Sequence, residues 1–237
     1  METTEVTPVG TANEATRNLW VKRALKQIPA NSRLLDAGAG EHPYKPFCSH
    51  LRYVSQDFAR YDGQGDSRGL QTGRFDYRGL DIVCDVTAIP EADGSFDTIL
   101  CTEVLEHLPN PLQAIEEFAR LLRSGGQLIV TAPFCSLTHF APYHYYTGFS
   151  RYFYRHHLPA HGLDVVELEP NGNYFEYLAQ ELRRVPSVAG RYAADRPRRL
   201  ELFALRGVLA ILERLSKKGT ASAELLSFGY HVRAVKR

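Results

Sequence analysis

The 237-residue sequence predicts an α/β fold in which a mostly parallel sheet carries helices on both faces. Short apolar strands alternate with helices or loops over the first 132 residues, and polar residues follow each strand at its carboxyl end. The first strand runs into a glycine-rich turn at Gly38 and Gly40. A turn of bare backbone at the carboxyl edge of an open sheet is a usual place for a ligand.

The first elements follow from apolar periodicity and from proline positions. Residues 13–28 have an imperfect helical stripe that Pro29 closes, and residues 32–37 form the first strand. Pro43 and Pro46 predict a short or distorted helix over residues 42–50, before the second strand at residues 52–56.

The middle of the chain begins with a long loop over residues 59–80, rich in Gly, Asp, Arg and Tyr. Loops of this length usually carry function or are disordered. Strands are predicted at residues 80–84, 95–101 and 127–132. Asn110 and Pro111 start a helix over residues 111–122, which the Gly125-Gly126 pair ends.

The last third adds helices and two strands. Residues 133–161 are rich in histidine and tyrosine, and residues 150–161 within them are predicted to be helical. A strand at residues 163–169 precedes helices at 174–185 and 198–217, and the alternating residues 230–235 form a final edge strand.

Composition excludes several classes of partner. The formal net charge is +1 with no large basic block, so nucleic acid is not expected as a partner. No apolar run approaches the roughly 18 residues of a membrane span, and the polar N-terminus does not resemble a signal peptide. The four cysteines are far apart without a CxxC pair, which favours a reduced, cytoplasmic protein.

The glycine turn alone leaves two alternatives open, a tight turn without a ligand and a dinucleotide site. A nicotinamide or flavin site would have a third glycine where this chain has Pro43. Asp57 follows the second strand, about 20 residues after the first glycine, which is the spacing at which a carboxylate accepts from both ribose hydroxyls of a nucleotide.

Five motifs in order resemble the class I S-adenosylmethionine-dependent methyltransferases: DAGAG, QDF, CDV, SFDTILCTEVLEHL and SGGQLIV. The resemblance covers residues 34–132 and, more weakly, the last strand. It implies a doubly wound, Rossmann-like sheet of seven mostly parallel strands in the order 3-2-1-4-5-7-6, with strand 7 antiparallel. The departure from the family pattern is His42, which stands at the usual third glycine.

The resemblance also implies roles for individual residues toward S-adenosylmethionine. The methionine end would be lined by Asp36, Gly38, Gly40, Thr102 and Glu103, with His107 further along the turn. Asp57 would take the ribose hydroxyls and Phe58 would pack near the adenine. Asp85 would accept from the adenine amino group, and the Val86 amide would face the ring edge.

Three histidines are candidates for a general base if the methyl acceptor is a hydroxyl, because imidazole titrates near the working pH. His107 either caps its turn or acts in the chemistry, and His139 is either structural or catalytic. His144 is structural, binds the acceptor or acts as the base. The histidines show no compact ligand spacing along the chain, so no metal site is expected.

The leading hypothesis is O-methylation of a small molecule, such as a sugar, a glycan or a natural-product hydroxyl. The aromatic and histidine-rich residues 133–161 suit a polyhydroxylated acceptor, because rings pack on sugar faces. Alternatives are an N-methyltransferase on an amine or amino sugar, and a non-catalytic cofactor-binding partner protein. Pro43 disfavours a dinucleotide oxidoreductase.

We expect one methyltransferase domain over residues 1–237. It would have a flexible tail at residues 1–12 and an N-terminal helix at residues 13–28. Residues 133–161 and 171–228 would be acceptor-side and helical additions. The sequence does not indicate an oligomeric state.

Overall fold

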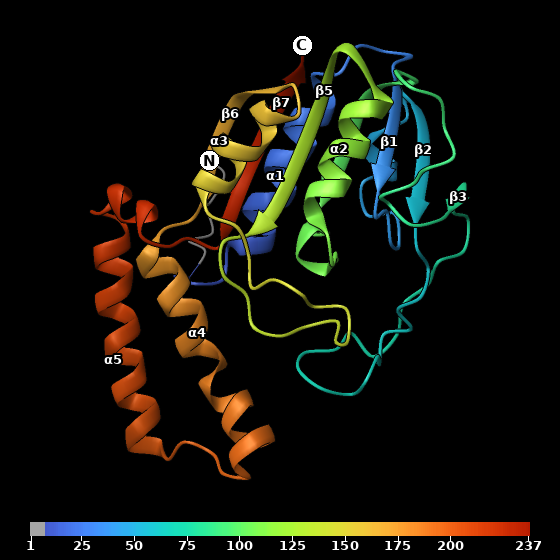
Figure 1. Ribbon diagram of the computed structural model, residues 1–237. Coiled ribbons are helices and arrows are strands. Elements are labelled where there is room, and N and C mark those ends of the chain that lie inside the picture. Colours follow the sequence, from blue (N-terminus) through green and yellow to red (C-terminus); the bar gives the residue numbers. More distant parts are fainter. Residues whose placement is uncertain (1–7) are drawn as a thin grey trace. The chain divides into compact units, whose positions relative to one another are not determined.

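The computed structural model describes residues 8–237 and contains a seven-stranded sheet with the order β3-β2-β1-β4-β5-β7-β6 (Figure 1). The strands are β1 (Arg33–Ala37), β2 (Arg52–Asp57), β3 (Ile82–Val83), β4 (Phe96–Thr102), β5 (Leu122–Pro133), β6 (Leu163–Asn171) and β7 (Gly229–Lys236). The pairs from β3 through β5 are parallel, whereas β7 runs antiparallel to β5. The predicted fold class and strand order are confirmed.

The helices also lie close to their predicted positions. They are α1 (Asn13–Lys26), α2 (Pro111–Leu121), α3 (Arg151–Ala160), α4 (Tyr174–Val188) and α5 (Arg199–Ser216). Short turns are η1 (Lys45–Phe47), η2 (Leu105–His107) and η4 (Thr220–Glu224), all 3-10 helical, and η3 (Ala189–Ala193), which is π-helical. None of the described helices combines the length and apolar character needed to cross a bilayer, and the predicted cytoplasmic location stays a prediction.

Two strands differ from the prediction. β3 is only two residues long. β5 starts at Leu122, directly after α2. The Gly125-Gly126 pair therefore lies inside this strand and does not end the preceding helix. Phe96 pairs with Leu122 and Thr98 with Gln127, so the residues between Leu122 and Gln127 form a bulge. Gly125 has φ +74°, a conformation that glycine adopts at little cost.

Within the described residues the chain divides into two compact units. The sheet unit contains Asn18–Glu169 and Gly229–Arg237. The hairpin unit contains residues 8–17 and Pro170–Phe228. The predicted role of residues 171–228 as an addition to the domain stays a prediction. The expectation that the chain forms one domain stays a prediction.

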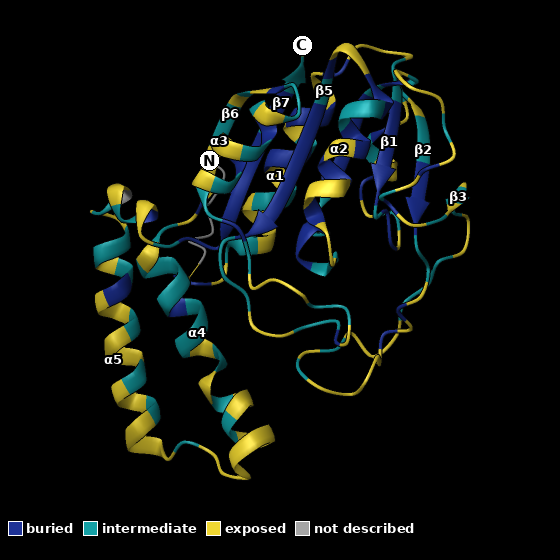
Figure 2. Ribbon diagram, viewed as in Figure 1, coloured by how far each residue is buried: buried dark blue, intermediate teal, exposed yellow. Residues whose placement is uncertain are grey.

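Helices cover both faces of the sheet unit. On one face, Val21 and Leu25 of α1 pack against Leu34, Leu100 and Ile129. On the other face, α2 and α3 contribute buried side chains to a second core. Figure 2 shows the strands β1 and β5 largely buried, while the loops below the carboxyl ends are mostly half-buried or exposed. The strand β4, which pairs with both, is also mostly buried. The buried part of the unit is therefore the sheet, and its carboxyl edge carries the longer loops.

The single tryptophan fixes α1 to the sheet unit. Trp20 is 3% exposed, and its ring stacks on His231 of β7 with centroids 4.9 Å apart. Its indole N–H donates to Oε1 of Glu167 at 2.8 Å, and Arg233 pairs with Oε2 of the same carboxylate at 3.2 Å. Tryptophan therefore buries a large apolar ring while its polar N–H keeps a partner.

In the hairpin unit, α4 and α5 share a small apolar core that includes Ala179 and Leu212. α4 begins after the N-cap Asn173, whose side chain accepts from two backbone N–H groups of the first turn. α4 continues three residues past its predicted end at residue 185, through Pro186 to Val188, before the π-helical turn.

The predicted flexible tail over residues 1–12 lies partly outside the described residues. Of its described part, Val9 is buried in the core of the hairpin unit. The N–H of Gly10 donates to Oε2 of Glu176 at 2.6 Å. Residues 8–12 are therefore packed and hydrogen-bonded, which differs from the expected tail.

Candidate functional site

The glycine turn after β1 has the conformation that its sequence requires. Gly38 has φ +77° and Gly40 has φ +50°, in the left-handed region where a side chain is strained. A Cβ on Gly38 would lie 2.3 Å from Cγ2 of Val104, the residue between β4 and η2. The turn therefore presents bare backbone and packs closely against the next segment at this edge.

Asp57 lies beside this turn at the end of β2. It is 7% exposed; its Oδ2 accepts from the N–H of Gly40, and its Oδ1 accepts from the N–H of Ala59, both at 3.0 Å. Burial raises the pKa of the Asp57 carboxyl, and the backbone hydrogen bonds from Ala59 and Gly40 act against that rise. The carboxylate is thus held in one position at the ends of two adjacent strands.

Asp36, also predicted for the cofactor, is engaged inside the protein. Its Oδ2 accepts from the hydroxyl of Tyr53 at 2.6 Å, and the residue is 1% exposed. Burial raises the pKa of Asp36 to about 7, although the Tyr53 hydrogen bond opposes the shift. The structure shows Asp36 as a buried acid that links β1 to β2, and its contact with the methionine end stays a prediction.

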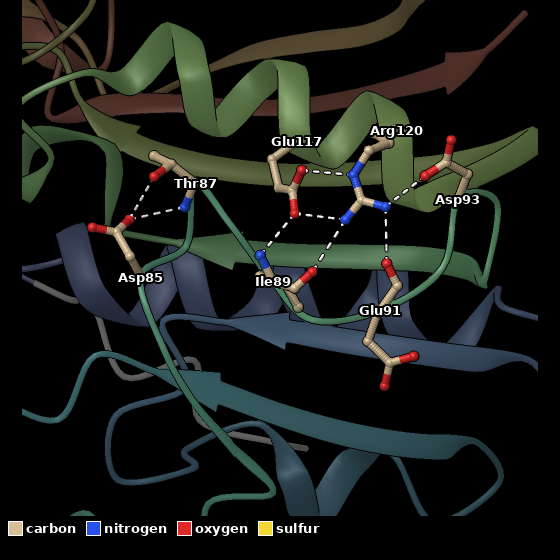
Figure 3. Close-up of polar contacts among 7 residues, drawn as sticks. All are labelled: Asp85, Thr87, Ile89, Glu91, Asp93, Glu117 and Arg120. Atoms are coloured by element: carbon tan, nitrogen blue, oxygen red, sulfur yellow. Dashed lines mark hydrogen bonds and ion pairs between the residues drawn. The ribbon is translucent and has the colours of Figure 1, made fainter.

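The segment that follows β3 is anchored by a salt-bridged network (Figure 3). Asp85 accepts through Oδ1 from both the backbone N–H and the hydroxyl of Thr87, at 2.9 and 2.8 Å. The Arg120 guanidinium on α2 pairs with Glu117 at 2.7 Å and donates to the carbonyl of Ile89 at 3.1 Å. The Arg120 network holds residues 89–93, while Asp85 is hydrogen-bonded locally to Thr87 and Val86 is buried.

The end of β4 turns sharply. Glu103 has φ +53°, which is uncommon for a residue other than glycine. Its N–H donates to the carbonyl of Thr131 at 2.8 Å, and the Thr131 hydroxyl donates to its Oε1 at 2.8 Å. These bonds between β4 and β5 hold the strained turn that follows Thr102, as such conformations require.

Two loops at the carboxyl edge are joined by backbone hydrogen bonds. The N–H of Leu70 donates to the carbonyl of Thr138 at 2.9 Å, and the N–H of Phe140 donates to the carbonyl of Leu70 at 3.0 Å. Gly65 lies against Ala141 so closely that a Cβ would be 1.8 Å from the Ala141 carbonyl oxygen. The loop over residues 59–80 contains no helix and is bonded to the segment after β5.

Aromatic rings connect the glycine turn with this loop pair. A Cβ on Gly40 would lie 3.0 Å from Cζ of Phe75, whose ring meets that of Phe140 at a centroid distance of 5.9 Å. Phe140 in turn stacks on His107 at 5.0 Å with an interplanar angle of 23°. Phe58 meets Tyr143 edge to face at 5.0 Å. Rings therefore occupy the space between the turn and the imidazoles.

The fold brings the three candidate histidines together. One ring nitrogen each of His107, His139 and His144 lies within 4.8 Å of the others. His107 and His139 meet edge to face at a centroid distance of 4.7 Å, and His139 and His144 are 4.8 Å apart. We call these three residues the histidine cluster. The spacing along the chain, from which no metal site was expected, did not indicate this convergence.

Backbone carbonyls hold two of these rings. Nδ1 of His107 lies 2.5 Å from the carbonyl oxygen of Tyr143, and Nδ1 of His139 lies 2.8 Å from that of Leu137. A carbonyl oxygen only accepts, so both Nδ1 atoms carry hydrogen. Burial, reinforced by the neighbouring imidazole of His139, lowers the pKa of His107 to about 3, so its ring is neutral at ordinary pH.

A buried carboxylate lies next to the histidine cluster and was not predicted. Glu106 is 0% exposed, and its Oε1 lies 3.7 Å from Nε2 of His107 and 3.9 Å from Nε2 of His139. Its position in the VLEHL motif was visible in the sequence, but its burial was not. The remaining histidines of the 133–161 segment, His156, His157 and His161, lie on or directly after α3 and outside the cluster.

Comparison with known proteins identifies the family. The family described as a methyltransferase domain matches residues 14–184. The ubiquinone biosynthesis O-methyltransferase of Xanthomonas oryzae pv. oryzae is 44% identical over 64 residues, which are 27% of this chain and 26% of that protein. The chain therefore matches only about a quarter of the length of the first curated relatives.

Solved structures share the fold at low sequence identity. The cyclase SpnF has a TM-score of 0.57 and 17% identity, over 96% of this chain and 83% of that chain. Phosphoethanolamine N-methyltransferase 2 of Haemonchus contortus, solved with S-adenosyl-L-methionine, has a TM-score of 0.51 and 17% identity, over 93% of this chain and 52% of that one. Because the family match spans more than half of the sequence and the sheet has the predicted order, this chain belongs to the methyltransferase domain family, as its motifs predicted.

Proposed function

We propose that this protein transfers a methyl group from S-adenosylmethionine to a hydroxyl oxygen of a small molecule. The observation that carries the proposal is the histidine cluster at the same sheet edge as the glycine turn, linked to it through Phe75 and Phe140. When bound, S-adenosylmethionine supplies a methyl group on a positively charged sulfur.

The residues at this edge fit that donor. Gly38 and Gly40 give the turn the positive-φ backbone that the motif requires, and the turn packs against Val104 and Phe75. Each oxygen of the Asp57 carboxylate accepts one backbone N–H and keeps a second lone pair for a ribose hydroxyl. The anchored segment at Asp85 and Val86 is proposed to face the adenine, and Thr102 and Glu103 the methionine end, as the motifs predict.

The acceptor side must mainly hold an oxygen in line with the methyl group, because positioning supplies much of the acceleration in such a displacement. The oxygen–carbon bond forms while the carbon–sulfur bond breaks and its electron pair stays on sulfur. The hydroxyl proton must also leave. We assign its acceptance to Nε2 of His139, because the Nδ1 atom of this ring is bonded to the Leu137 carbonyl and its side chain is 24% exposed.

Two observations support a hydroxyl and, within that class, a saccharide or a natural-product hydroxyl. The curated relatives that match part of the chain carry the name O-methyltransferase. The site edge combines neutral imidazole with stacked rings such as Tyr61 on Phe140, at a centroid distance of 4.4 Å. Imidazoles and aromatic faces suit a polyhydroxylated molecule.

The experiment has two stages. Calorimetry should detect binding of S-adenosylmethionine and S-adenosylhomocysteine but not of NAD; failure of both sulfur ligands to bind a folded sample would refute the donor. An acceptor screen with labelled donor then compares hydroxylated compounds with amines, and NMR of the product locates the methyl group. If the labelled methyl group is found only on nitrogen, the protein is an N-methyltransferase and the proposal of O-methylation is wrong.

His139 is tested within the same screen. His139→Ala should lower turnover about 10²–10⁴-fold with donor affinity unchanged, as expected for a general base. His156→Ala is the matched control, because His156 is an exposed histidine of α3 outside the cluster. Equal turnover of His139→Ala and the parent protein would remove His139 from the chemistry.

A further inference from the structure

The histidine cluster has the composition of a metal site. We propose that His107, His139 and His144 bind a divalent transition-metal ion, Zn²⁺ in particular, with the carboxylate of Glu106 beside it. The site lies where the methyl acceptor is proposed to bind.

The orientation of two rings supports a metal. Because backbone carbonyls hold Nδ1–H of His107 and His139, both Nε2 atoms present lone pairs. Histidines that bind metals typically donate their other ring N–H to such a carbonyl or to a carboxylate, which fixes the tautomer and the ring. This arrangement is therefore the one that a metal-binding imidazole needs.

The charge distribution points the same way. Both Nε2 lone pairs lie 3.7–3.9 Å from Oε1 of the fully buried Glu106. A divalent cation at this position would compensate the buried carboxylate and bind both nitrogens.

His144 supplies the third nitrogen. Both of its ring nitrogens are buried and have no hydrogen-bond partner among residues 8–237. An imidazole in that state loses hydrogen bonds to water without replacement, which is costly. Coordination through one ring nitrogen would remove part of that cost.

The donor set selects the metal. Imidazole nitrogens suit Zn²⁺, Cu²⁺ and Ni²⁺, whereas Mg²⁺ and Ca²⁺ prefer oxygen ligands. Three protein ligands with an open position are typical of catalytic zinc. Zn–N bonds of about 2.0–2.1 Å place tetrahedral ligands roughly 3.3 Å apart, so the rings must rotate inward from their present spacing when the ion binds.

The consequence for catalysis rests on the proposed function. An acceptor oxygen at the open position would be oriented and its pKa lowered, so that its proton leaves to solvent before the oxygen–methyl bond forms. His139 would then act as a ligand of the ion, and the metal would replace it in activating the hydroxyl.

The test uses full-length protein treated with a chelator and then titrated calorimetrically with Zn²⁺ and, separately, Mg²⁺. We expect one equivalent of Zn²⁺ and no comparable binding of Mg²⁺. Co²⁺ in place of Zn²⁺ should give the visible absorption of a low-symmetry nitrogen site. Absence of stoichiometric Zn²⁺ binding would overturn the inference.

Variants identify the ligands. His144→Phe keeps a ring but no donor, and it should weaken Zn²⁺ binding at least tenfold, as should His107→Phe; His156→Ala is the control and should bind as the parent does. Unchanged affinity in both cluster variants would assign the ion to other groups and overturn the inference. If His107→Phe does not fold, His144→Phe alone decides.

The two proposals fail separately. S-adenosylhomocysteine binding and methyl transfer are measured on the same samples with and without Zn²⁺. Methyl transfer without any Zn²⁺ binding would refute the metal site alone. Stoichiometric Zn²⁺ binding without transfer to any acceptor would refute the proposed activity alone.

Discussion

The backbone N–H of Gly40 donates to Oδ2 of Asp57 at 3.0 Å, so the turn after β1 and the acid after β2 form one hydrogen-bonded unit. The carboxylate that is proposed to hold the ribose therefore also holds the glycine turn. Its other oxygen accepts from Ala59 and fixes the start of the loop over residues 59–80. Substitution at Asp57 should affect both binding and folding.

Asp57→Ala should weaken S-adenosylhomocysteine binding by about 2–3 kcal/mol, because charge-assisted hydrogen bonds contribute about 1.5–3 kcal/mol each. It should also lower the free energy of unfolding by about 1–3 kcal/mol, since the buried N–H of Gly40 and the half-buried N–H of Ala59 lose their acceptor. Calorimetry and urea unfolding measure the two effects. Less than about a tenfold change in affinity would show that Asp57 does not bind the ribose.

Gly65→Ala should separate the two loops at the carboxyl edge. Its φ is +51° and its Cβ would meet the Ala141 carbonyl oxygen at 1.8 Å. Gly73→Ala is the matched control, with φ +82° in the same loop but nothing within 4 Å of the added Cβ. Hydrogen exchange at Leu70 should be at least about tenfold faster in Gly65→Ala than in Gly73→Ala. Equal exchange would show that the contact does not hold the loop.

Arg120→Met should destabilise the segment after β3. Glu117, which is 8% exposed, would keep a buried charge without its partner, and we expect a loss of about 2–3 kcal/mol in the free energy of unfolding. Arg123→Met is the control, because its side chain is 56% exposed and its pair with Asp97 should contribute less than about 1 kcal/mol. Similar losses in the two variants would contradict the role of the network.

Asp36 makes stability depend on pH. Its pKa is about 7 in the folded protein and 3.8 for the unperturbed group, so between these values the folded state holds a proton that the unfolded state has lost. This contribution to stability therefore falls as pH rises through this range. Relative to Asp36→Asn, the parent protein should lose about 2–3 kcal/mol between pH 5 and pH 8. If urea unfolding gives the same difference in the free energy of unfolding between the parent protein and Asp36→Asn at pH 5 and at pH 8, Asp36 is not protonated in the folded state.

The sheet could be predicted because its determinants are local. Leu34 and Leu35 are apolar, and the glycines that follow them permit the positive φ of a tight turn, so β1 and its turn follow from neighbouring residues. β5 was harder, since its bulge depends on pairing with Phe96 and Thr98, which lie on another strand. A glycine pair looks the same in sequence whether it ends a helix or forms a bulge.

The histidine cluster could be predicted only as separate candidates. His107 belongs to η2, whereas His139 and His144 lie in a segment without regular structure. Their convergence depends on long-range contacts, such as the bonds from Leu70 to Thr138 and Phe140. Glu106 was missed for a related reason, because carboxylates are rarely fully buried and nothing in its neighbours indicates that this one is.

The position of Trp20 makes intrinsic fluorescence a probe of one site in the protein. It is the single tryptophan of the chain, it is buried, and its ring stacks on His231 of β7. Selectively excited indole emission therefore comes from one place, the contact between α1 and the sheet. Circular dichroism is instead dominated by all helices, including α4 and α5 of the hairpin unit. Comparison of the two signals can thus show whether the sheet unit and the hairpin unit unfold together, without any label.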